Sequence, residues 1–237
     1  MNKGIIYYTD NRIDSEPFIP MARKFISDSG LPIVSCSLKP IDFGENIVLK
    51  NRQRSYPTMV DQIVLCLAYS KADYVFFCEH DVLYHKSHFD FVPTADDVFF
   101  YNFNDWRWDY YTDRIIHYNE LTSLSQLCVN RKFALDHYQR RQQKIIEWQL
   151  DVTRSREPRQ GRIWGYEPGT KKTRNGGFSD DKCLTWKSEF PNVDIRHGHT
   201  FSKPKTTLDS FKHLPTGWEE TTIDKVPGWD LKGLFNL

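Results

Sequence analysis

The sequence predicts an α/β protein whose mostly parallel central sheet is flanked by helices and followed by an irregular C-terminal extension. Two observations predict this class. In the N-terminal part of the chain, short β-rich runs alternate with amphipathic stretches, which is the βαβ order of a parallel sheet. The third run, YVFFC at residues 74–78, is almost wholly apolar, as expected of a central strand that is covered on both faces.

The other elements of the alternation follow from local patterns. GIIYYTDN, at residues 4–11, is a short β-rich run ended by turn formers and is predicted as the first strand. Apolar residues at helical spacing predict a helix over residues 17–30, which stops at a glycine. LPIVSCSL, at residues 31–38, is the second strand. A second helix is expected within residues 55–72, beginning near Thr58.

Beyond the third strand, the sequence predicts fewer regular elements. DVFFYNFNDWRW, at residues 97–108, is typical of a pair of aromatic strands. Residues 127–151 are rich in helix formers and hold a long helix that ends near Leu150. DKCLTWKSEF, at residues 181–190, is predicted as a helix, and residues 192–205 as a short strand that leads into a polar loop.

Composition limits the partners and the location. A net charge of +1 over 237 residues gives no global electrostatic reason to expect nucleic acid or a membrane surface. The N-terminal MNKGIIYYTDNR lacks an apolar signal region, and no run approaches the roughly 18 apolar residues of a membrane span. The five cysteines are scattered without a CxxC pair, which favours reduced thiols. We therefore expect a cytoplasmic protein without a membrane span; the sequence does not indicate its oligomeric state.

Three consecutive ionisable residues, Glu79, His80 and Asp81, follow the third strand directly. Buried charge is costly unless it is paired or bound to a metal, and ligands of open α/β sheets bind beyond the carboxyl ends of the strands. Residues i and i+2 of an extended segment point the same way, so Glu79 and Asp81 can converge on one divalent cation. The alternative, a solvated acidic turn, is the commoner meaning of such a triplet elsewhere, but the position after an apolar central strand favours a metal site.

Two late histidines strengthen this interpretation. IRHGHTF places His197 and His199 at alternate positions after a predicted strand. An imidazole that folds back onto the early carboxylates would complete a mixed oxygen and nitrogen site, which suits Mn²⁺. The alternative is a pair of surface histidines beside a glycine turn.

Taken together, these stretches resemble glycosyltransferases of the GT-A fold. The resemblance lies in IIYYTDN, in the helix before YVFFCEHDVLYH and in the late PNVDIRHGHTFSK; FFCEHDVLYH, GYEPGT and SEFPNVDIRHG are similar to a family-A or family-two-like subgroup of bacterial and phage sequences. It implies a nucleotide-sugar donor whose diphosphate binds Mn²⁺ or Mg²⁺ at a short acidic motif. Asp81 would be the principal ligand and His197 the late ligand, with His199 as its substitute. Glu79 stands where the family has an aspartate, and would contact the ribose, the metal or a metal-bound water.

The resemblance extends over most of the chain and implies a domain organisation. Residues 1–205 would form the nucleotide-sugar transferase domain, and residues 206–237 a tail packed on it. Thr9, Asp10 and Asn11 would line the pocket for the nucleobase and the ribose. A turn at the end of a strand explains these three residues equally well.

Two arginines after the second strand are candidates for binding the donor diphosphate. Arg52 and Arg54, in LKNRQRSYPT, can pair bidentately with phosphate oxygens. A solvated basic loop is the alternative interpretation.

An inverting enzyme also needs a carboxylate that deprotonates the acceptor hydroxyl. Asp181 and Glu167, the latter in WGYEPGT, are the two candidates, and Asp181 resembles the base that opens a helix in many inverting members of the family. The neighbouring Asp180 is explained as well by helix capping.

The acceptor is indicated only weakly. Residues 154–174 carry seven Lys and Arg against two Glu, which favours an anionic acceptor such as a glycolipid, a polysaccharide or a nucleic acid with hydroxylated bases, although basic loops are often just solvated. The aromatic residues of NFNDWRWDYY, at residues 102–111, are candidates for stacking on sugar rings or bases, although aromatics more often belong to a core.

Two other functions compete with sugar transfer. A nucleotidyltransferase normally has a glycine-rich basic loop after its first strand, and IIYYTDNRIDSEP has no glycine there. A non-catalytic module that binds sugar or nucleic acid, built on a degenerate transferase, is the second. A dinucleotide-dependent oxidoreductase is excluded because no GxGxxG follows a strand.

Overall fold

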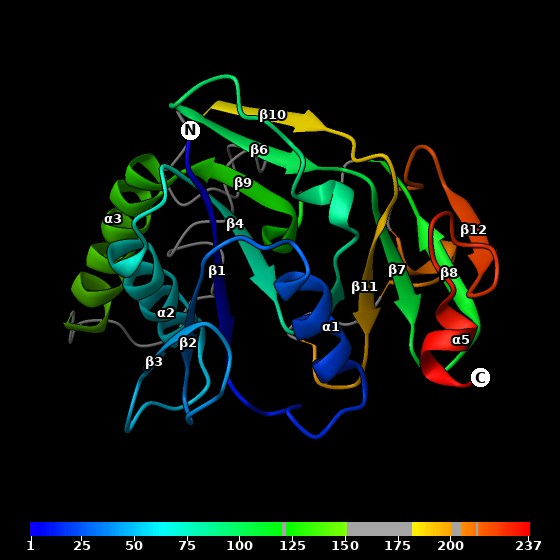
Figure 1. The fold of residues 1–237 in the computed structure, drawn as a ribbon, viewed down its shortest axis with the longest axis horizontal. Helices are drawn as coiled ribbons and strands as arrows, with labels where there is room; N and C mark the ends of the chain where they lie inside the picture. Colours follow the sequence, from blue (N-terminus) through cyan, green and yellow to red (C-terminus); the bar gives the residue numbers. More distant parts are fainter. Residues whose placement is uncertain (120–121, 151–181, 201–204, 212) are drawn as a thin grey trace.

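The chain folds around a seven-stranded sheet, seen in the computed structural model of Figure 1, which describes residues 1–119, 122–150, 182–200, 205–211 and 213–237. In spatial order its strands are β10 (Lys182–Trp186), β6 (Val98–Asn102), β9 (Leu127–Asn130), β4 (Tyr74–Glu79), β1 (Lys3–Thr9), β2 (Ile33–Ser37) and β3 (Glu45–Val48). All neighbouring pairs are parallel except the two that β9 makes with β4 and β6. The predicted α/β class with a mostly parallel central sheet is therefore confirmed.

A second, five-stranded sheet packs beside the first (Figure 1). In spatial order it consists of β12 (Glu219–Thr222), β8 (Arg114–His117), β7 (Asp105–Asp109), β11 (Asn192–Arg196) and β5 (Val82–Leu83). The pairing of β11 with β5 is antiparallel and sets Asp194 opposite Val82. The backbone N–H of Ile195 donates to the carbonyl of Asp81 at 2.8 Å. This pairing brings the carboxyl end of a late strand next to the end of β4.

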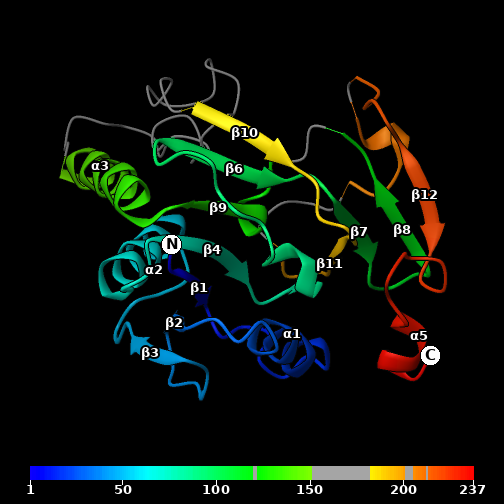
Figure 2. The ribbon, with the colours of Figure 1, turned by 45° about the horizontal axis from the view of Figure 1, so that its top comes forward.

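Four α-helices complete the described structure: α1 (Phe18–Ser27), α2 (Tyr56–Tyr69), α3 (Arg131–Leu150) and the short α5 (Leu231–Phe235). Figure 2 shows α2 and α3 on one side of the large sheet, and α1 with the second sheet on the other. The alternation of side chains along β1 explains why both faces are covered. Ile6 and Tyr8 pack in the cluster with α2 and α3, whereas Ile5 and Tyr7 pack with α1.

Several predictions differ from the observed elements. The helix predicted over residues 181–190 is wrong: residues Lys182–Trp186 form β10, because pairing with β6 places Cys183 opposite Phe99 and supplies the backbone hydrogen bonds of an edge strand. Helix α2 begins earlier than expected, since Ser55 is its N-cap and accepts from the backbone N–H of Thr58 at 3.2 Å.

Two strands form at residues 97–108 as predicted, but they do not pair with each other: β6 belongs to the large sheet and β7 to the second sheet. The late strand and the long helix are confirmed as β11 and α3. The short strands β3 and β9 have no counterpart in the predicted elements. Within residues 206–237, β12 adds a strand to the second sheet and α5 follows it, so part of the predicted irregular extension is regular.

The described helices include none that is long and apolar enough to cross a membrane. Cys36, Cys66, Cys78 and Cys128 are buried free thiols, and Cys183 is half-buried.

A buried polar network lies inside the second sheet and centres on Asp105. This carboxylate is fully buried and accepts hydrogen bonds from the Ser123 hydroxyl and the Gln126 amide, both at 3.1 Å. Burial, followed by the negative charge of Asp194, raises the pKa of Asp105 to about 7. The folded state therefore binds a proton at acidic to neutral pH that the unfolded state has already lost.

We predict that this proton makes the folded state less stable as the pH rises. Between the unfolded pKa of Asp105 near 3.8 and its folded pKa of about 7, the free energy of unfolding should fall by up to about 1.4 kcal/mol per pH unit, because only the native state holds the proton. Asp105→Asn should lack this component. Urea titrations at several pH values measure it, with Asp209→Asn, an exposed aspartate, as the control that follows the wild type. Parallel pH profiles for Asp105→Asn and the wild type would contradict the assignment.

Candidate functional site

A cavity of about 420 Å³ opens at the carboxyl edge of the large sheet. Its walls are the ends of β1, β4 and β11 and the first turn of α2. These three strands run downward in Figure 1 and end in the lower half of the molecule in that view. The cavity therefore occupies the place where ligands bind in open α/β sheets.

Three side chains in this cavity form a group that can hold a metal ion. His80, Asp81 and His197 each offer one ligand atom, and these atoms lie within 4.8 Å of one another. His80 and Asp81 come from the turn between β4 and β5, and His197 follows the last residue of β11. The Nδ1 atom of His80 is buried and has no hydrogen-bond partner among the described residues. Beside a carboxylate and a second imidazole, this nitrogen is available to a metal ion.

The position of His197 follows from strand pairing. Because the N–H of Ile195 donates to the carbonyl of Asp81, the end of β11 is fixed against the turn after β4. The imidazole of His197 is 4% exposed, packs 5.6 Å from the ring of Phe18 on α1, and points its Nε2 at the carboxylate of Asp81, 3.3 Å away.

The hydrogen bonds of His197 also fix its tautomer. The backbone N–H of His199 donates to Nδ1 of His197 at 3.2 Å, so the proton of the neutral ring sits on Nε2 and faces Asp81. A cation bound at Nε2 would take the place of this proton. The neutral ring would then carry its proton on Nδ1, where it could not accept from the His199 N–H.

The donor set suits some divalent ions better than others. Two imidazole nitrogens suit the later transition metals, and the carboxylate suits Mn²⁺, which accepts mixed oxygen and nitrogen ligands. Mg²⁺ prefers carboxylate oxygens and water. These residues therefore fit Mn²⁺, and fit Mg²⁺ less well.

The two carboxyl groups of the motif are in different protonation states. Burial by itself would raise the pKa of Asp81, but the hydrogen bond from His197 and the nearby His80 and Arg196 outweigh burial and lower it, so Asp81 stays ionised. Burial, with the charge of Asp81, raises the pKa of Glu79 to about 8. Glu79 is therefore mostly protonated at neutral pH, and it accepts a hydrogen bond from the Tyr8 hydroxyl at 2.6 Å. It lines the cavity but lies outside the group of three ligands.

The predicted donor-binding residues divide into two sets. Thr9, Asp10 and Arg54 line the cavity, as does His199. The carboxylate of Asp10 lies 2.6 Å from Nε of Arg54, and Nη2 of Arg54 donates to the carbonyl of His199 at 3.1 Å. Arg54 thus connects the ends of β1 and β11 just before the start of α2.

Asn11 and Arg52 are not among the described residues that line this cavity. The amide oxygen of Asn11 accepts from the backbone N–H groups of Leu38 and Lys39, both at 2.8 Å, and its φ of 59° lies in the left-handed region. Arg52 pairs with Asp61 at 3.0 Å.

Both candidate bases, Asp181 and Glu167, and the basic stretch at residues 154–174 lie outside the described residues.

Sequence reasoning missed several residues of the cavity. His80 lies between the two carboxylates of the motif, and that position was a usable signal. Arg196 lines the cavity from the end of β11, and Asp194, two residues earlier on the same face, pairs with it at 3.2 Å. Burial opposes the charge of Arg196, but Asp194 and Asp81 raise its pKa further, so the guanidinium stays charged. Arg12 is a third arginine at this cavity.

The described lining therefore carries three guanidinium cations. Three arginines (Arg12, Arg54, Arg196) and three histidines face three acidic residues, one of which is mostly neutral. With a divalent ion added, the cavity is suited to a ligand with several negative charges.

Neither a protein-family model nor a curated protein matches the sequence. Among solved structures, the chain is similar to the glycosyltransferase GlyE of Streptococcus pneumoniae TIGR4, at 10% identity and a TM-score of 0.43, over 78% of this chain and 45% of that one. The apo form of GlyE gives 11% identity and a TM-score of 0.39, over 67% and 41%. A mutant of Drosophila β1,4-galactosyltransferase 7 in complex with manganese, UDP-Gal and xylobiose gives 16% identity and a TM-score of 0.36, over 56% and 50%.

The chain thus spans half or less of these solved structures. With TM-scores below 0.5, the likeness is a partly shared arrangement of helices and strands. The chemistry of the cavity is therefore inferred from its own residues.

We predict that the protein binds Mn²⁺ more tightly than Mg²⁺ without any nucleotide present. His80→Ala and Asp81→Asn should each weaken Mn²⁺ binding about tenfold or more in isothermal titration calorimetry, because the first removes a ligand nitrogen and the second replaces a charged carboxylate by a neutral amide. Glu79→Gln, which retains an acceptor for Tyr8, should bind like the wild type. His85→Ala is the matched control, since His85 lies nearby on the chain but bonds to Ser87. Unchanged affinity in both His80→Ala and Asp81→Asn would exclude this site.

Proposed function

We propose that the chain is a metal-dependent glycosyltransferase of the GT-A type. It would move a sugar from a nucleotide-diphosphate sugar to a hydroxyl acceptor. The observation that carries this proposal is the group of His80, Asp81 and His197, in which Nδ1 of His80 has no hydrogen-bond partner among the described residues. The group lies in a cavity lined by three arginines at the carboxyl edge of a mostly parallel sheet. A diphosphate that leaves during the reaction needs this combination of a cation site and guanidinium groups.

Different residues of the cavity would bind different parts of the donor. His80, Asp81 and His197 would hold Mn²⁺, which would neutralise the negative charge that develops on the diphosphate as it leaves. Arg54 and Arg196 would bind phosphate oxygens through their guanidinium groups. Asp10 holds Arg54 in place, and the mostly protonated Glu79 would hydrogen-bond a ribose hydroxyl. Thr9 and Asp10 would lie next to the nucleoside.

The deprotonation of the acceptor is assigned to a carboxylate on the chain. For an inverting reaction, we propose Asp181 as the base, with Glu167 as the alternative. Residues 1–205 would form the transferase domain. The free cysteines fit a protein that acts in the cytoplasm, where thiols remain reduced.

Two other functions would use the same cavity. A nucleotidyltransferase would bind a nucleoside triphosphate with the same cations, and a non-catalytic module would bind a sugar nucleotide without turning it over. Turnover separates all three, because only the transferase releases a nucleoside diphosphate from a nucleotide-diphosphate sugar.

The test combines binding and turnover with a matched pair of arginine variants. UDP-, GDP-, TDP- and CMP-sugars are screened by thermal shift with Mn²⁺ and with EDTA, since a ligand that binds only the native state raises its stability. We predict that one nucleotide class stabilises the protein only with Mn²⁺ and is turned over. Arg54→Ala should lower the affinity for that donor about tenfold or more, because a charge-assisted hydrogen bond is lost. Arg52→Ala should leave it unchanged, since Arg52 is not among the described residues that line the cavity.

Different failures have different meanings. Metal-dependent binding without turnover would favour the non-catalytic module. Equal losses in Arg54→Ala and Arg52→Ala would contradict the position assigned to the diphosphate. No stabilisation by any sugar nucleotide, with Mn²⁺ bound, would contradict the glycosyltransferase itself.

A further inference from the structure

An exposed tyrosine stands next to the loop that carries His197. Tyr111 lies in the turn between β7 and β8 and is 72% exposed. Its hydroxyl accepts a hydrogen bond from the backbone N–H of Gly198 at 3.2 Å, and Gly198 lies between His197 and His199. The ring is therefore held within one residue of a proposed metal ligand while most of its surface remains open to solvent.

The turn that carries this ring is firmly fixed. The N–H of Tyr110 donates to the carbonyl of Arg196 at 3.2 Å, which joins the turn to the end of β11. Within the turn, the N–H of Thr112 donates to the carbonyl of Asp109, and the indole N–H of Trp108 donates to the carbonyl of Thr112, both at 2.9 Å. An aromatic ring that is held in place before binding loses little conformational entropy when a ligand packs on it.

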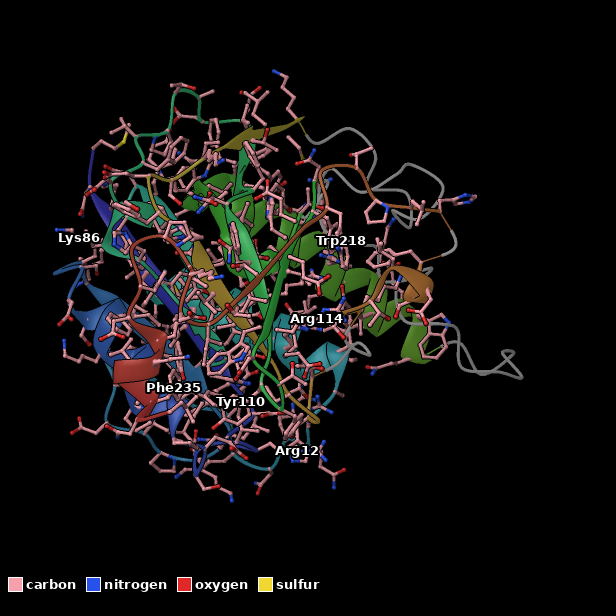
Figure 3. All side chains as sticks on the ribbon, turned by 90° about the vertical axis from the view of Figure 1, so that its right-hand side faces the viewer. Arg12, Lys86, Tyr110, Arg114, Trp218 and Phe235 are labelled. Carbon is pink, nitrogen blue, oxygen red and sulfur yellow. The ribbon has the colours of Figure 1, made fainter. Side chains whose placement is uncertain are left out.

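Tyr111 packs against a neighbouring aromatic ring that itself contacts other rings. Tyr110 packs edge-to-face against Tyr111 at 5.8 Å and against Phe18 at 5.2 Å, and it contacts Phe235 of α5 at 6.4 Å. Figure 3 shows Tyr110 beside Phe235, toward the same end of the molecule as Arg12, which lines the cavity. The exposed ring of Tyr111 thus packs against a cluster of aromatic side chains at the end of the second sheet that lies next to the cavity.

The charge of the turn limits what this ring can bind. The turn DYYTD, residues 109–113, carries two carboxylates and no Lys or Arg. The carboxylate of Glu16 contributes to raising the pKa of Tyr110, so a third negative group is close. A nucleic acid presents a phosphate at every residue and is attracted by clustered cations, so this turn would repel it. Neutral sugars have no such charge, and carboxylates accept hydrogen bonds from their hydroxyl groups.

We propose that Tyr111 is the stacking platform for a neutral saccharide acceptor, with Asp109 and Asp113 as acceptors for its hydroxyl groups. This inference rests on the proposed function, because the platform would present the acceptor hydroxyl to the donor bound at His80, Asp81 and His197. The apolar face of a pyranose ring, formed by its C–H groups, packs on the tyrosine ring. The proposed acceptor is thus a neutral saccharide, in place of the anionic acceptor expected from the sequence.

The test measures saccharide binding without donor or metal. Saturation-transfer NMR is recorded with neutral disaccharides (cellobiose, xylobiose, lactose, maltose, chitobiose) and with a short single-stranded DNA. We predict that at least one disaccharide binds the wild type, that Tyr111→Ala weakens it about tenfold, and that Tyr111→Phe, which retains the ring, stays within about threefold. Tyr69→Ala is the matched control, because Tyr69 is also exposed, at 56%, and is the last residue of α2, whose first turn lines the cavity. Binding of Mn²⁺ should be unchanged in all three variants.

The outcomes separate this inference from the proposed function. Saccharide binding that depends on Tyr111, in a protein that turns over no sugar nucleotide, would support the platform and overturn the transferase. If donor is turned over but Tyr111→Ala has the wild-type KM for the acceptor, the transferase stands and the platform is overturned. The platform is also overturned if no disaccharide binds, or if the DNA binds through Tyr111 in preference to them.

Discussion

A backbone hydrogen bond from the N–H of Ile195 to the carbonyl of Asp81 fixes the end of β11, which precedes His197, against the turn that carries His80 and Asp81. It belongs to the pairing of β11 with β5, which connects the second sheet to the turn after β4. His197 and Asp81 are 116 residues apart along the chain, and the pairing of β11 with β5 brings them together in space. The same strand end holds Tyr110 through the carbonyl of Arg196. The proposed metal ligand His197 and the proposed acceptor platform thus depend on the same strand.

The fold makes this arrangement stable by distributing charge over the cavity. Placing two carboxyl groups two residues apart in a buried turn would be costly if both were ionised. Asp81 keeps its charge because cationic and hydrogen-bonding groups surround it, whereas Glu79 is mostly protonated and bonded to Tyr8. Behind them, Asp194 and Arg196 form a buried ion pair that turns a guanidinium toward the cavity. The result is a cavity with an ionised ligand for a cation and positive charge for an anion.

Much of the fold followed from local patterns, because the strands of the large sheet are short, apolar and separated by amphipathic helices. The position of Glu79, His80 and Asp81 at the end of β4 followed from the same reasoning. β10 was mistaken for a helix because its strand conformation comes from pairing with β6, and such pairing leaves little signal in a single segment.

The individual roles in the site were harder to predict for a related reason. Tyr8 binds Glu79 from 71 residues away, and this contact diverts Glu79 from the group of metal ligands. The amide oxygen of Asn11 accepts hydrogen bonds from the backbone of Leu38 and Lys39, and Arg52 forms an ion pair with Asp61. Spacing along the chain indicates which residues can meet at a sheet edge, whereas long-range partners decide which of them remain available to a ligand.

The most direct test of the central claim is the location of the metal itself. Crystals grown with Mn²⁺ and a nucleoside diphosphate can be measured at the manganese absorption edge, where anomalous scattering marks the ion. The structure predicts one strong peak bonded to Nδ1 of His80, the carboxylate of Asp81 and Nε2 of His197, with the diphosphate beside it and the His199 N–H released from His197. A peak held by other residues, or a diphosphate bound in this cavity without an ion, would contradict the account.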